Sequence, residues 1–552
     1  MSNPDVAAPR RASALVRLRR IGIDTYQVPV IYMRRDCAVC RSEGFEAQSR
    51  IEVRHNGRRV TVTLNVVNAN WLADDEAGLS ETAWRLLQAQ EGDTAELTHP
   101  ETLESLSAMR GKVYGRRLQA DEIGAIVKDI AAGRYSELEL AAFVTACAGD
   151  RLDRDETIAL TRAMAYAGEK LHWNRTLVVD KHCIGGLPGN RTTLIVVPIV
   201  AAFGLTIPKT PSRAITSPAG TADTMETLAP VDLDLPAMRR VVEREGGCIV
   251  WGGAVQLSPA DDVLIRVERP LDFDSEGQLV ASVLSKKLAA GSTHVLIDIP
   301  VGSTAKVRSA DAANTLSECL IETGHALGMN VRTCITDGQQ PVGRGIGPAL
   351  EARDVLAVLR NDPAAPRDLR ERSLDLAGQV LEFAPTVTAG AGRQRAQEIL
   401  DSGTAWKKFQ AIAEVQGGLR APPESRFRQT VPALRSGTVE AIDNRRLSRL
   451  AKLAGAPRAA AVGLDLHVRL AQQIDAGTPL FTVHADSSGE LSYALDYLGN
   501  YPDIIRLAAG VIEKICCCPH LRLVRRRRNE TLALCAAWQR SVRPEAPRKR
   551  RL

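Results

Sequence analysis

One segment of the sequence combines glycines and a cation in the way that anion-binding loops do. Residues 176–197 read as a strand, a loop and a helix. Gly185 and Gly186 let backbone N–H groups approach a ligand closely, and Lys181 adds a positive charge. The helix would begin at about Thr192, with Thr192 and Thr193 at its start, where unpaired N–H groups and the helix dipole favour an anion. We therefore expect phosphate to bind here, with an ordinary glycine-rich turn as the alternative.

The spacing of this loop excludes two common phosphate-binding motifs. Gly185 and Gly189 are four residues apart, and Arg191 follows two residues later. A P-loop needs glycines five apart followed by Lys and Ser or Thr, and the loop does not match G-x-G-x-x-G either. If the loop binds phosphate, it belongs to another class.

A second segment, residues 211–226, gathers hydroxyl groups around Arg213 and Gly220. These hydroxyls belong to Ser212, Thr216, Ser217 and Thr221. Asp223 and Glu226 are three residues apart at the start of a predicted helix. Acids at such positions often cap the helix, so capping is the favoured interpretation for these two residues.

A third segment, residues 261–291, places two polar side chains on one face of a predicted helix. Ser282 and Lys286 are four residues apart, which brings them to the same side. Lys286 and Lys287 also lie near the predicted helix end at Gly291, where a cation is favoured in any case. Binding and dipole stabilisation are therefore both open interpretations of these lysines.

The elements that would position these segments fall into regions of different pattern. Residues 14–98 contain short alternating runs broken by Asn-Gly and Gly-Asp, which predict β-strands. Residues 105–170 are helical: apolar side chains at 123, 126, 127 and 130 follow the helical period. From 176, strands alternate with helices, which predicts a largely parallel sheet. After the prolines at 422, 423 and 432, residues 437–515 form a small further domain.

Composition excludes several classes of protein. Of the 552 residues, 45% are hydrophobic and 25% charged, which are globular values. Aromatic residues make up only 4%, which gives little support to stacking on single-stranded nucleic acid. The net charge is +6, but residues 519–552 carry 11 Lys and Arg against 2 Glu. The rest of the chain is therefore near neutral, and only the basic tail could bind nucleic acid.

Cysteine usage and apolar runs point to a soluble cytoplasmic protein. Cys37 and Cys40 form a C-x-x-C without a second pair at zinc-finger spacing, so we expect free thiols and no metal site. The N-terminus has no apolar leader, so secretion is not expected. The longest apolar run, residues 194–207, contains Pro198 and is shorter than the ~20 residues that span a bilayer.

Together, four motifs resemble the thymidine phosphorylase / pyrimidine nucleoside phosphorylase family. The resemblance covers roughly residues 105–515. Its motifs are Asp180-Lys-His-Cys-Ile-Gly-Gly, Ala219-Gly-Thr-Ala-Asp-Thr-Met-Glu, Ala281-Ser-Val-Leu-Ser-Lys-Lys-Leu-Ala-Ala-Gly and Ile335-Thr-Asp-Gly-Gln-Gln-Pro-Val-Gly. The match is closest to the long branch with an extra N-terminal β domain, which holds AMP phosphorylases and type 2 thymidine phosphorylases.

The resemblance implies a multidomain α/β fold and a dimer or larger homo-oligomer. Residues 1–100 would form an N-terminal β-rich domain. Residues 101–172 would form a helical domain, completed by about 260–290. Residues 173–425 would form the α/β catalytic domain and 437–515 a C-terminal α+β domain. The basic tail, residues 516–552, is expected to be disordered.

The resemblance also implies a set of site residues. Those expected to bind phosphate are Lys181, Cys183, Gly185, Gly186, Thr193 and Thr221. Those expected to bind the nucleoside or nucleotide are Ser212, Arg213, Ala214, Ile215, Thr216, Ser217, Arg266, Ser282, Lys286 and Lys306. His182 would lie near the base and sugar, and Asp274 would give a proton to the leaving base. Cys183 stands where nucleoside-specific members carry Ser, and Ser212–Ser217 matches the AMP branch.

The implied reaction is reversible phosphorolysis of thymidine to thymine and 2-deoxy-α-D-ribose 1-phosphate. Inorganic phosphate is a co-substrate, and no cofactor or metal is expected. AMP phosphorolysis, giving a base and ribose 1,5-bisphosphate, is the alternative because of residues 212–217. A phosphoribosyltransferase is the second alternative, because residues 220–226 resemble a segment of the anthranilate phosphoribosyltransferases.

Overall fold

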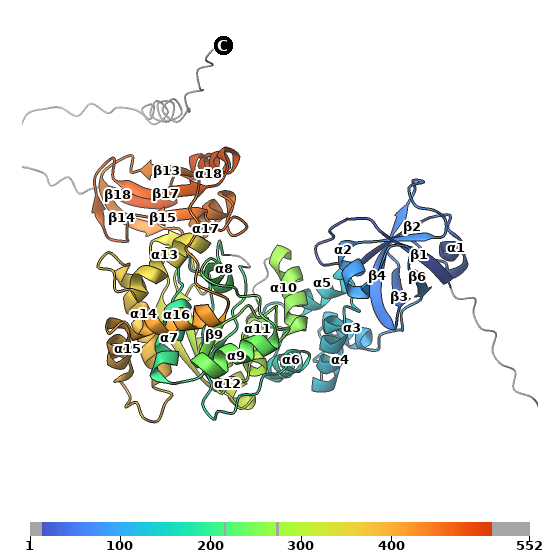
Figure 1. Cartoon of the computed structure of the whole chain (residues 1–552), viewed down its shortest axis with the longest axis horizontal. Coiled ribbons are helices and arrows are strands. Elements are labelled where there is room, and N and C mark those ends of the chain that lie inside the picture. Colours follow the sequence, from blue (N-terminus) through green and yellow to red (C-terminus); the bar gives the residue numbers. More distant parts are fainter. Residues whose placement is uncertain (1–13, 215–216, 272–274, 510–552) are drawn as a thin grey trace, which may run out of the picture. The chain divides into compact units, whose positions relative to one another are not determined.

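The computed structural model describes residues 14–214, 217–271 and 275–509 (Figure 1). Ile215, Thr216, Asp274 and the basic tail, all named above, lie outside these ranges. Within the described ranges, no helix is both long and apolar enough to cross a bilayer.

The N-terminal region is a closed β-barrel, as the alternating sequence predicts. Its strands run in the order β1-β5-β2-β4-β3-β6, in which β1 pairs with β5 and β2 with β4 in parallel. Ile51, Val53 and His55 of β3 all point inward, as alternation requires. The elements are β1 (Ala14–Arg20), β2 (Val30–Arg34), α1 (Ala38–Glu43), β3 (Arg50–His55), β4 (Arg58–Val67), β5 (Glu76–Leu79), α2 (Glu81–Leu87) and β6 (Thr94–Thr98).

The next region is a bundle of helices. Helix α4 buries the four apolar positions that its period predicts, 123, 126, 127 and 130. Leu264 and Ala281 belong to the same hydrophobic core, so two helices that come later in the sequence complete the bundle. The helices are α3 (Ser105–Val113), α4 (Ala120–Ala131), α5 (Glu137–Ala146), α6 (Arg154–Tyr166), α10 (Pro259–Leu271) and α11 (Glu276–Ala289).

The α/β region is built on parallel strands. Strands β11, β10 and β7 pair in that order, and a parallel bridge from Val178 to Thr206 connects them to the parallel pair β8-β9. The strands are β7 (Val179–Cys183), β8 (Ile207–Lys209), β9 (Gly247–Ile249), β10 (His294–Val301) and β11 (Asn330–Asp337). The helices are α7 (Thr193–Phe203), α8 (Thr221–Glu226), α9 (Leu235–Glu245), α12 (Ala310–Ala326), α13 (Pro348–Leu359), α14 (Arg367–Leu381), α15 (Gly392–Asp401) and α16 (Thr404–Val415).

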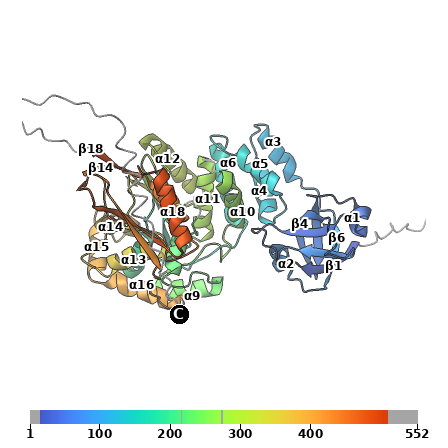
Figure 2. The ribbon, with the colours of Figure 1, turned by 90° about the horizontal axis from the view of Figure 1, so that it is seen from above.

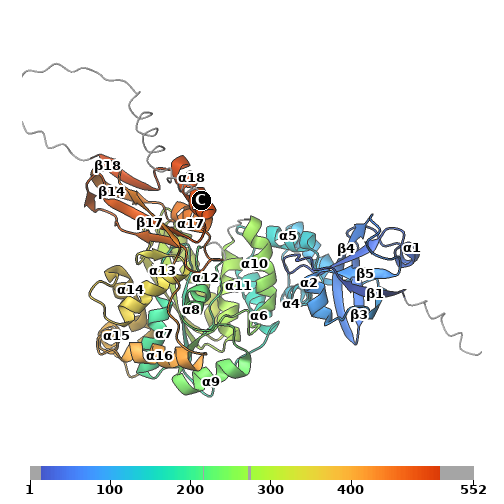
Figure 3. The ribbon, with the colours of Figure 1, turned by 45° about the horizontal axis from the view of Figure 1, so that its top comes forward.

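Helices cover both faces of this sheet, so its central strand β10 is largely apolar, with Asp298 as a buried exception. Leu296 of β10 packs into the core shared with α7, α14 and α16, whereas Val295 and Ile297 pack with α11 and α12. Figures 2 and 3 show α14 to α16 on one side of the sheet and α11 with α12 on the other. Burial on both faces explains a continuous hydrophobic run in place of alternation.

Strand β7 begins three residues later than the sequence indicates. The apolar run suggests a strand over 176–180, but β7 starts at Val179 because its partner β10 begins opposite it at His294. Consequently Lys181, His182 and Cys183 lie at the end of the strand rather than in the loop.

The C-terminal region contains two small sheets, ordered β12-β15-β17-β13 and β16-β14-β18. One strand, β12, comes from the segment before α13, so the α/β and C-terminal regions share a sheet. The elements are β12 (Gly345–Ile346), β13 (Phe427–Pro432), β14 (Gly437–Ile442), α17 (Asn444–Leu453), β15 (Gly463–Leu466), β16 (Gln473–Ile474), β17 (Pro479–Ala485), α18 (Ser488–Asn500) and β18 (Ile505–Ala509).

Asn444 should stabilise the junction between these two regions. Its fully buried side chain donates to Thr304 Oγ1 and to the Gly338 carbonyl, each at 3.0 Å. Asn444→Ala strands both acceptors, which should cost about 1–3 kcal/mol. We expect faster hydrogen exchange in residues 437–453 and a lower thermal midpoint. Asn500→Ala, at an exposed position of α18, is the control, and equal exchange in the two variants would contradict the role.

Candidate active site

Lys181 is the middle residue of the five-residue strand β7, and only 1% of it is exposed. Its ammonium donates to Thr192 Oγ1 at 2.7 Å and lies 3.6 Å from Asp298 Oδ2. An ammonium has three N–H donors, so one more is available to an oxyanion. Asp298 is itself held by Thr336 Oγ1 at 2.6 Å and by the Asn190 amide at 3.3 Å. The predicted phosphate lysine therefore has a fixed position.

Behind Lys181, the buried carboxylate of Asp180 binds two further ammonium groups. Lys209 Nζ donates to Asp180 Oδ1 at 2.9 Å, and Lys287 Nζ lies 2.7 Å from Asp180 Oδ2. Burial alone would raise the pKa of Asp180, but the two lysines hold it below its ordinary value. Burial lowers the pKa of Lys287 to about 7, and Asp180 opposes that fall. With Lys181 and Asp298 included, three buried lysines face two buried carboxylates, and a bound anion would favour the charged form of Lys287. This balance favours an additional anion.

His182 alternates with Lys181 along β7 and therefore points to the opposite face of the strand. Burial, reinforced by the charges of Lys287 and Lys209, holds the pKa of His182 well below its ordinary value. The imidazole is therefore neutral near pH 7, and it can exchange hydrogen bonds without adding a charge.

Cys183 organises the loop through its sulfur. Sγ accepts from the Gly185 N–H at 3.4 Å and from the Asn190 amide at 3.3 Å. Burial, together with Asp298, raises the pKa of Cys183 to about 12, so the thiol stays protonated. The position predicted to bind phosphate thus also shapes the loop that follows it.

The two glycines of the loop differ in their surroundings. Both have positive φ, 95° at Gly185 and 78° at Gly186. A Cβ at Gly186 would lie 2.5 Å from the Lys306 backbone nitrogen, whereas a Cβ at Gly185 would meet nothing within 4 Å. The structure therefore brings the loop against Lys306, another predicted site residue.

Thr221 and Thr193, the two predicted phosphate hydroxyls, lie at the starts of α8 and α7. Thr193 is 5% exposed. Thr221 Oγ1 accepts from Arg191 Nη1 at 3.0 Å, which connects it to the end of the glycine loop. Arg191 is buried and also pairs with Glu351.

The hydroxyl-rich segment is held by its two acids. Asp223 caps α8, as predicted, whereas the prediction is wrong for Glu226, which is the last residue of α8 and pairs with Arg213. Asp223 Oδ2 accepts from the backbone N–H groups of Ala214 at 2.7 Å and Gly220 at 2.8 Å. The guanidinium of Arg213 makes two contacts with Glu226, at 2.5 and 2.9 Å, and lies over the Trp251 ring. Its charge is therefore largely neutralised within the segment.

The two serines of this segment that were predicted to bind the nucleoside or nucleotide, Ser212 and Ser217, differ in their contacts. Ser217 Oγ donates to the Ala219 carbonyl at 2.7 Å. The Ser212 carbonyl accepts from the Ala222 N–H at 3.4 Å. Both serines are half-buried beside the start of α8.

The residues predicted to hold the base lie on α10 and α11. Ser282 and Lys286 share α11, as their spacing predicts. Lys286 pairs with Asp261 of α10; burial opposes its charge, but Asp261 raises the pKa of Lys286 above its ordinary value. Lys286 is therefore charged near pH 7. Arg266 of α10 contacts the half-exposed Glu137 at 2.6 Å.

Several site residues were not found from the sequence. Asp298 is a polar residue in an apolar strand, and Glu351 is an acid on the buried face of α13, so each carries a local signal. Arg191 and Lys209 carry none, because their partners are 28 to 160 positions away.

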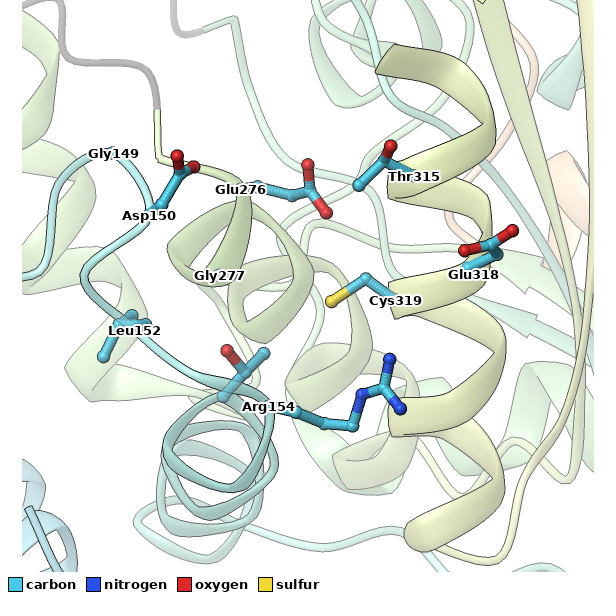
Figure 4. Close-up of a pocket in the computed structure, with 10 residues that line it drawn as sticks. Gly149, Asp150, Leu152, Arg154, Glu276, Gly277, Thr315, Glu318 and Cys319 are labelled. Atoms are coloured by element: carbon cyan, nitrogen blue, oxygen red, sulfur yellow. The ribbon is translucent and has the colours of Figure 1, made fainter. Parts of the chain in front are cut away.

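A separate pocket of about 240 Å³ lies beside α12, at the starts of α6 and α11 (Figure 4). Asp150, Glu276 and Glu318 line it, and burial together with Asp150 raises the pKa of Glu276. Figure 4 shows Arg154 projecting towards α12. Of the predicted site residues that the structure describes, none lines this pocket. Across the ranges that the structure covers, no cluster of three His, Cys, Asp or Glu side chains could hold a metal ion.

Exchanging each loop glycine for alanine should separate backbone strain from steric contact. Both substitutions impose a positive φ on a residue with a Cβ, costing roughly 1–2 kcal/mol. Gly186→Ala also drives a Cβ into Lys306, so it should weaken binding of inorganic phosphate by at least tenfold, whereas Gly185→Ala should weaken it less. The phosphate-induced rise in thermal midpoint measures both. Equal losses would show that contact with Lys306 is unimportant.

His182 should make stability depend on pH. At pH values below 6.5, the ordinary pKa of histidine, His182 is protonated in the unfolded chain but stays neutral in the folded chain. The free energy of unfolding should therefore fall as pH decreases from 7 towards 5, by up to about 1.4 kcal/mol per pH unit. His182→Gln should flatten this slope, and His325→Gln, at an exposed position of α12, should retain it. Denaturant titrations at several pH values measure the slope; an unchanged slope in His182→Gln would be contradictory.

Three regions of the chain match models of known families. Residues 175–406 match "Glycosyl transferase family, a/b domain", and residues 106–168 match "Glycosyl transferase family, helical bundle domain". Residues 438–504 match "Pyrimidine nucleoside phosphorylase C-terminal domain". The matches follow the order of the helical, α/β and C-terminal regions described above.

The chain is also similar to curated proteins over most of its length. A Polaromonas protein named "Putative thymidine phosphorylase" is 65% identical over 89% of this chain and 96% of its own. A Legionella pneumophila protein of the same name is 57% identical over 92% and 98%. Anthranilate phosphoribosyltransferase from Thermus thermophilus aligns with 56% of this chain and 99% of its own at 20% identity, with a TM-score of 0.46, too low to bear on fold or activity. The chain thus belongs to the thymidine phosphorylase / pyrimidine nucleoside phosphorylase family and is a pentosyltransferase.

Proposed function

We propose that the chain catalyses the reversible phosphorolysis of thymidine, giving thymine and 2-deoxy-α-D-ribose 1-phosphate. The observation that carries the proposal is the group of three buried lysines, Lys181, Lys209 and Lys287, around two buried carboxylates towards the carboxyl ends of parallel strands. Such ends are where ligands bind in open α/β sheets. The names of the relatives support thymidine as the nucleoside.

The phosphate is the nucleophile in this reaction, and the glycine loop would bind and orient it. Lys181 would donate to one oxygen, while the Gly186 N–H and the hydroxyl of Thr221 would bind the others. The Gly185 N–H would join them by exchanging its long contact with Cys183 Sγ for the phosphate. An oxygen held in this way can attack C1′ as the N-glycosidic bond breaks. Alignment of two bound reactants can contribute roughly 7–11 kcal/mol to lowering the barrier.

The departing pyrimidine takes the electrons of the broken bond and needs a positive partner. Lys286 is suited to this, because Asp261 keeps it charged. Arg266 is the second candidate, because its pair with Glu137 is half-exposed and such pairs contribute only about 0–1 kcal/mol. His182, being neutral, would bind the sugar or base by hydrogen bonds.

AMP remains the alternative substrate because of the hydroxyl-rich segment 212–217. A 5′-phosphate would lie among those hydroxyls, but Arg213 is already paired with Glu226 and Asp223. A dianionic phosphate would have to compete with those carboxylates, which favours an uncharged 5′ group. Asp274 stays the predicted proton donor for a purine leaving group.

Release of the free base from a panel of substrates decides between these reactions. Purified protein with phosphate is offered thymidine, uridine, AMP, CMP and UMP, and separately base with phosphoribosyl pyrophosphate and Mg²⁺. We expect thymidine to react fastest. Preferred cleavage of AMP would establish the nucleotide activity, and turnover only with the pyrophosphate would establish a transferase. Light scattering of the same preparation tests the expected dimer or larger homo-oligomer.

Lys181→Ala should remove most of the activity, chiefly through weaker use of phosphate. Loss of a buried charge-assisted contact typically costs about 1.5–3 kcal/mol, so kcat/KM for phosphate should fall roughly 10- to 150-fold or more. Steady-state kinetics with varied phosphate measure this. Lys128→Ala, at an exposed position of α4, is the control. A variant whose phosphate dependence is unchanged would remove Lys181 from the phosphate site.

A further inference from the structure

Arg191 connects three segments that meet at the predicted phosphate site. It ends the glycine loop, and its guanidinium is buried, with 8% of the residue exposed. Nε pairs with Glu351 of α13, Nη1 donates to Thr221 Oγ1 at 3.0 Å, and Nη2 donates to the Ala219 carbonyl at 2.9 Å. A buried guanidinium with three directed contacts fixes the groups that it touches.

The contact with Arg191 fixes the direction of one hydrogen bond of the Thr221 hydroxyl. A guanidinium only donates hydrogen bonds, so Thr221 Oγ1 must accept from Arg191. The single O–H of Thr221 is then left to donate elsewhere. Lys181 imposes the same role on Thr192. By contrast, Ser217 and Thr224 donate to acceptors of the protein, the Ala219 carbonyl and Glu351.

The charge of Arg191 adds little to the attraction of an anion, because Glu351 opposes it. Burial raises the pKa of Glu351, and Arg191 opposes that rise, together with the Gly347 N–H and the Thr224 hydroxyl. The pair is therefore close to neutral as seen from the phosphate site. What Arg191 contributes is geometry: it occupies one lone pair of the Thr221 hydroxyl and holds that hydroxyl beside the glycine loop, with its O–H available to donate.

We propose that Arg191 is a positioning residue for phosphate, acting through the hydroxyl of Thr221. The inference rests on the proposed function only in taking phosphate as the ligand of this loop; it is independent of the nucleoside. Arg191 has no direct contact with phosphate in this account. Its removal weakens phosphate binding because the Thr221 hydroxyl is then free to rotate and to donate to the protein.

A double-mutant cycle on binding of inorganic phosphate tests this mechanism. Arg191→Lys keeps a cation opposite Glu351, so the buried carboxylate keeps a partner, but a single ammonium cannot hold both loops. Thr221→Val removes the hydroxyl and keeps the shape. Each single variant should bind phosphate roughly 10-fold more weakly or worse, as loss of a hydrogen bond to a charged group implies. The double variant should bind no more weakly than Thr221→Val.

The readout is phosphate affinity, by calorimetry and by the phosphate-induced rise in thermal midpoint, with no nucleoside present. In a Thr221→Ser background, which keeps the hydroxyl, Arg191→Lys should again weaken binding. Arg240→Lys, at an exposed position of α9, should leave affinity unchanged. The variant Arg191→Gln/Glu351→Gln, which removes both charges of the buried pair, provides a second test should Arg191→Lys fold poorly, and it too should bind phosphate roughly 10-fold more weakly.

The outcomes separate this inference from the proposed function. Losses that multiply in the double variant would mean that Arg191 acts independently of Thr221, and unchanged affinity in Arg191→Lys would mean that it does not act at all; either overturns the inference. Coupled losses in a protein that does not cleave thymidine would support the inference and defeat the proposed function. A wild-type chain without affinity for phosphate would defeat both.

Discussion

The site depends on a buried carboxylate, Asp180, which lies between the ammonium groups of Lys209 and Lys287. Removing a charge of this kind from water costs several kcal/mol, and only a close opposite charge offsets it. Asp180 allows Lys209 and Lys287 to be buried away from water next to a third lysine, Lys181. Without Asp180, three buried cations would face only the carboxylate of Asp298. In the proposed function, phosphate is attracted by the positive charge that remains unpaired in this nearly balanced interior.

Parallel strand topology explains why these charges meet at one place. Lys181 and Lys209 lie towards the carboxyl ends of β7 and β8, and the neighbouring strand β10 contributes Asp298 close to its own end. All strands of the sheet run in one direction, so their ends share an edge. Successive side chains of β7 point to opposite faces of the sheet, so they face two different groups of residues. Lys181 and Cys183 face the loop side, while Asp180 and His182 face the side on which Lys287 lies.

The sequence contained enough to predict the regions but not the register. The β-rich start, the helical region and the parallel α/β region each have a period or a composition of their own. Ser282 and Lys286 were correctly placed on one helix because that relation is local. Strand β7 was placed too early because its start is set by β10, more than 100 residues later. The roles predicted for the site residues stay predictions, although the structure brings Lys181, Thr221 and Lys306 to the same loop.

The contacts that sequence reasoning missed are those with distant partners. Nothing near Arg191 indicates Glu351, which lies 160 positions away. Asp223 illustrates the opposite case: its capping contacts are local, and the spacing alone favoured them.

The distribution of paired and unpaired charge bears on the kind of substrate the site accepts. The glycine loop keeps a surplus of positive charge, whereas Arg213, at the hydroxyl-rich segment, is balanced by Glu226 and Asp223. Two phosphate dianions close together repel each other, so a site built to bind both would need surplus cations at both positions. Among the residues that the structure describes, the glycine loop adjoins three buried lysines, whereas Arg213 is paired with two carboxylates. This charge pattern supports the proposal of one phosphate and an uncharged nucleoside over phosphate and a nucleotide.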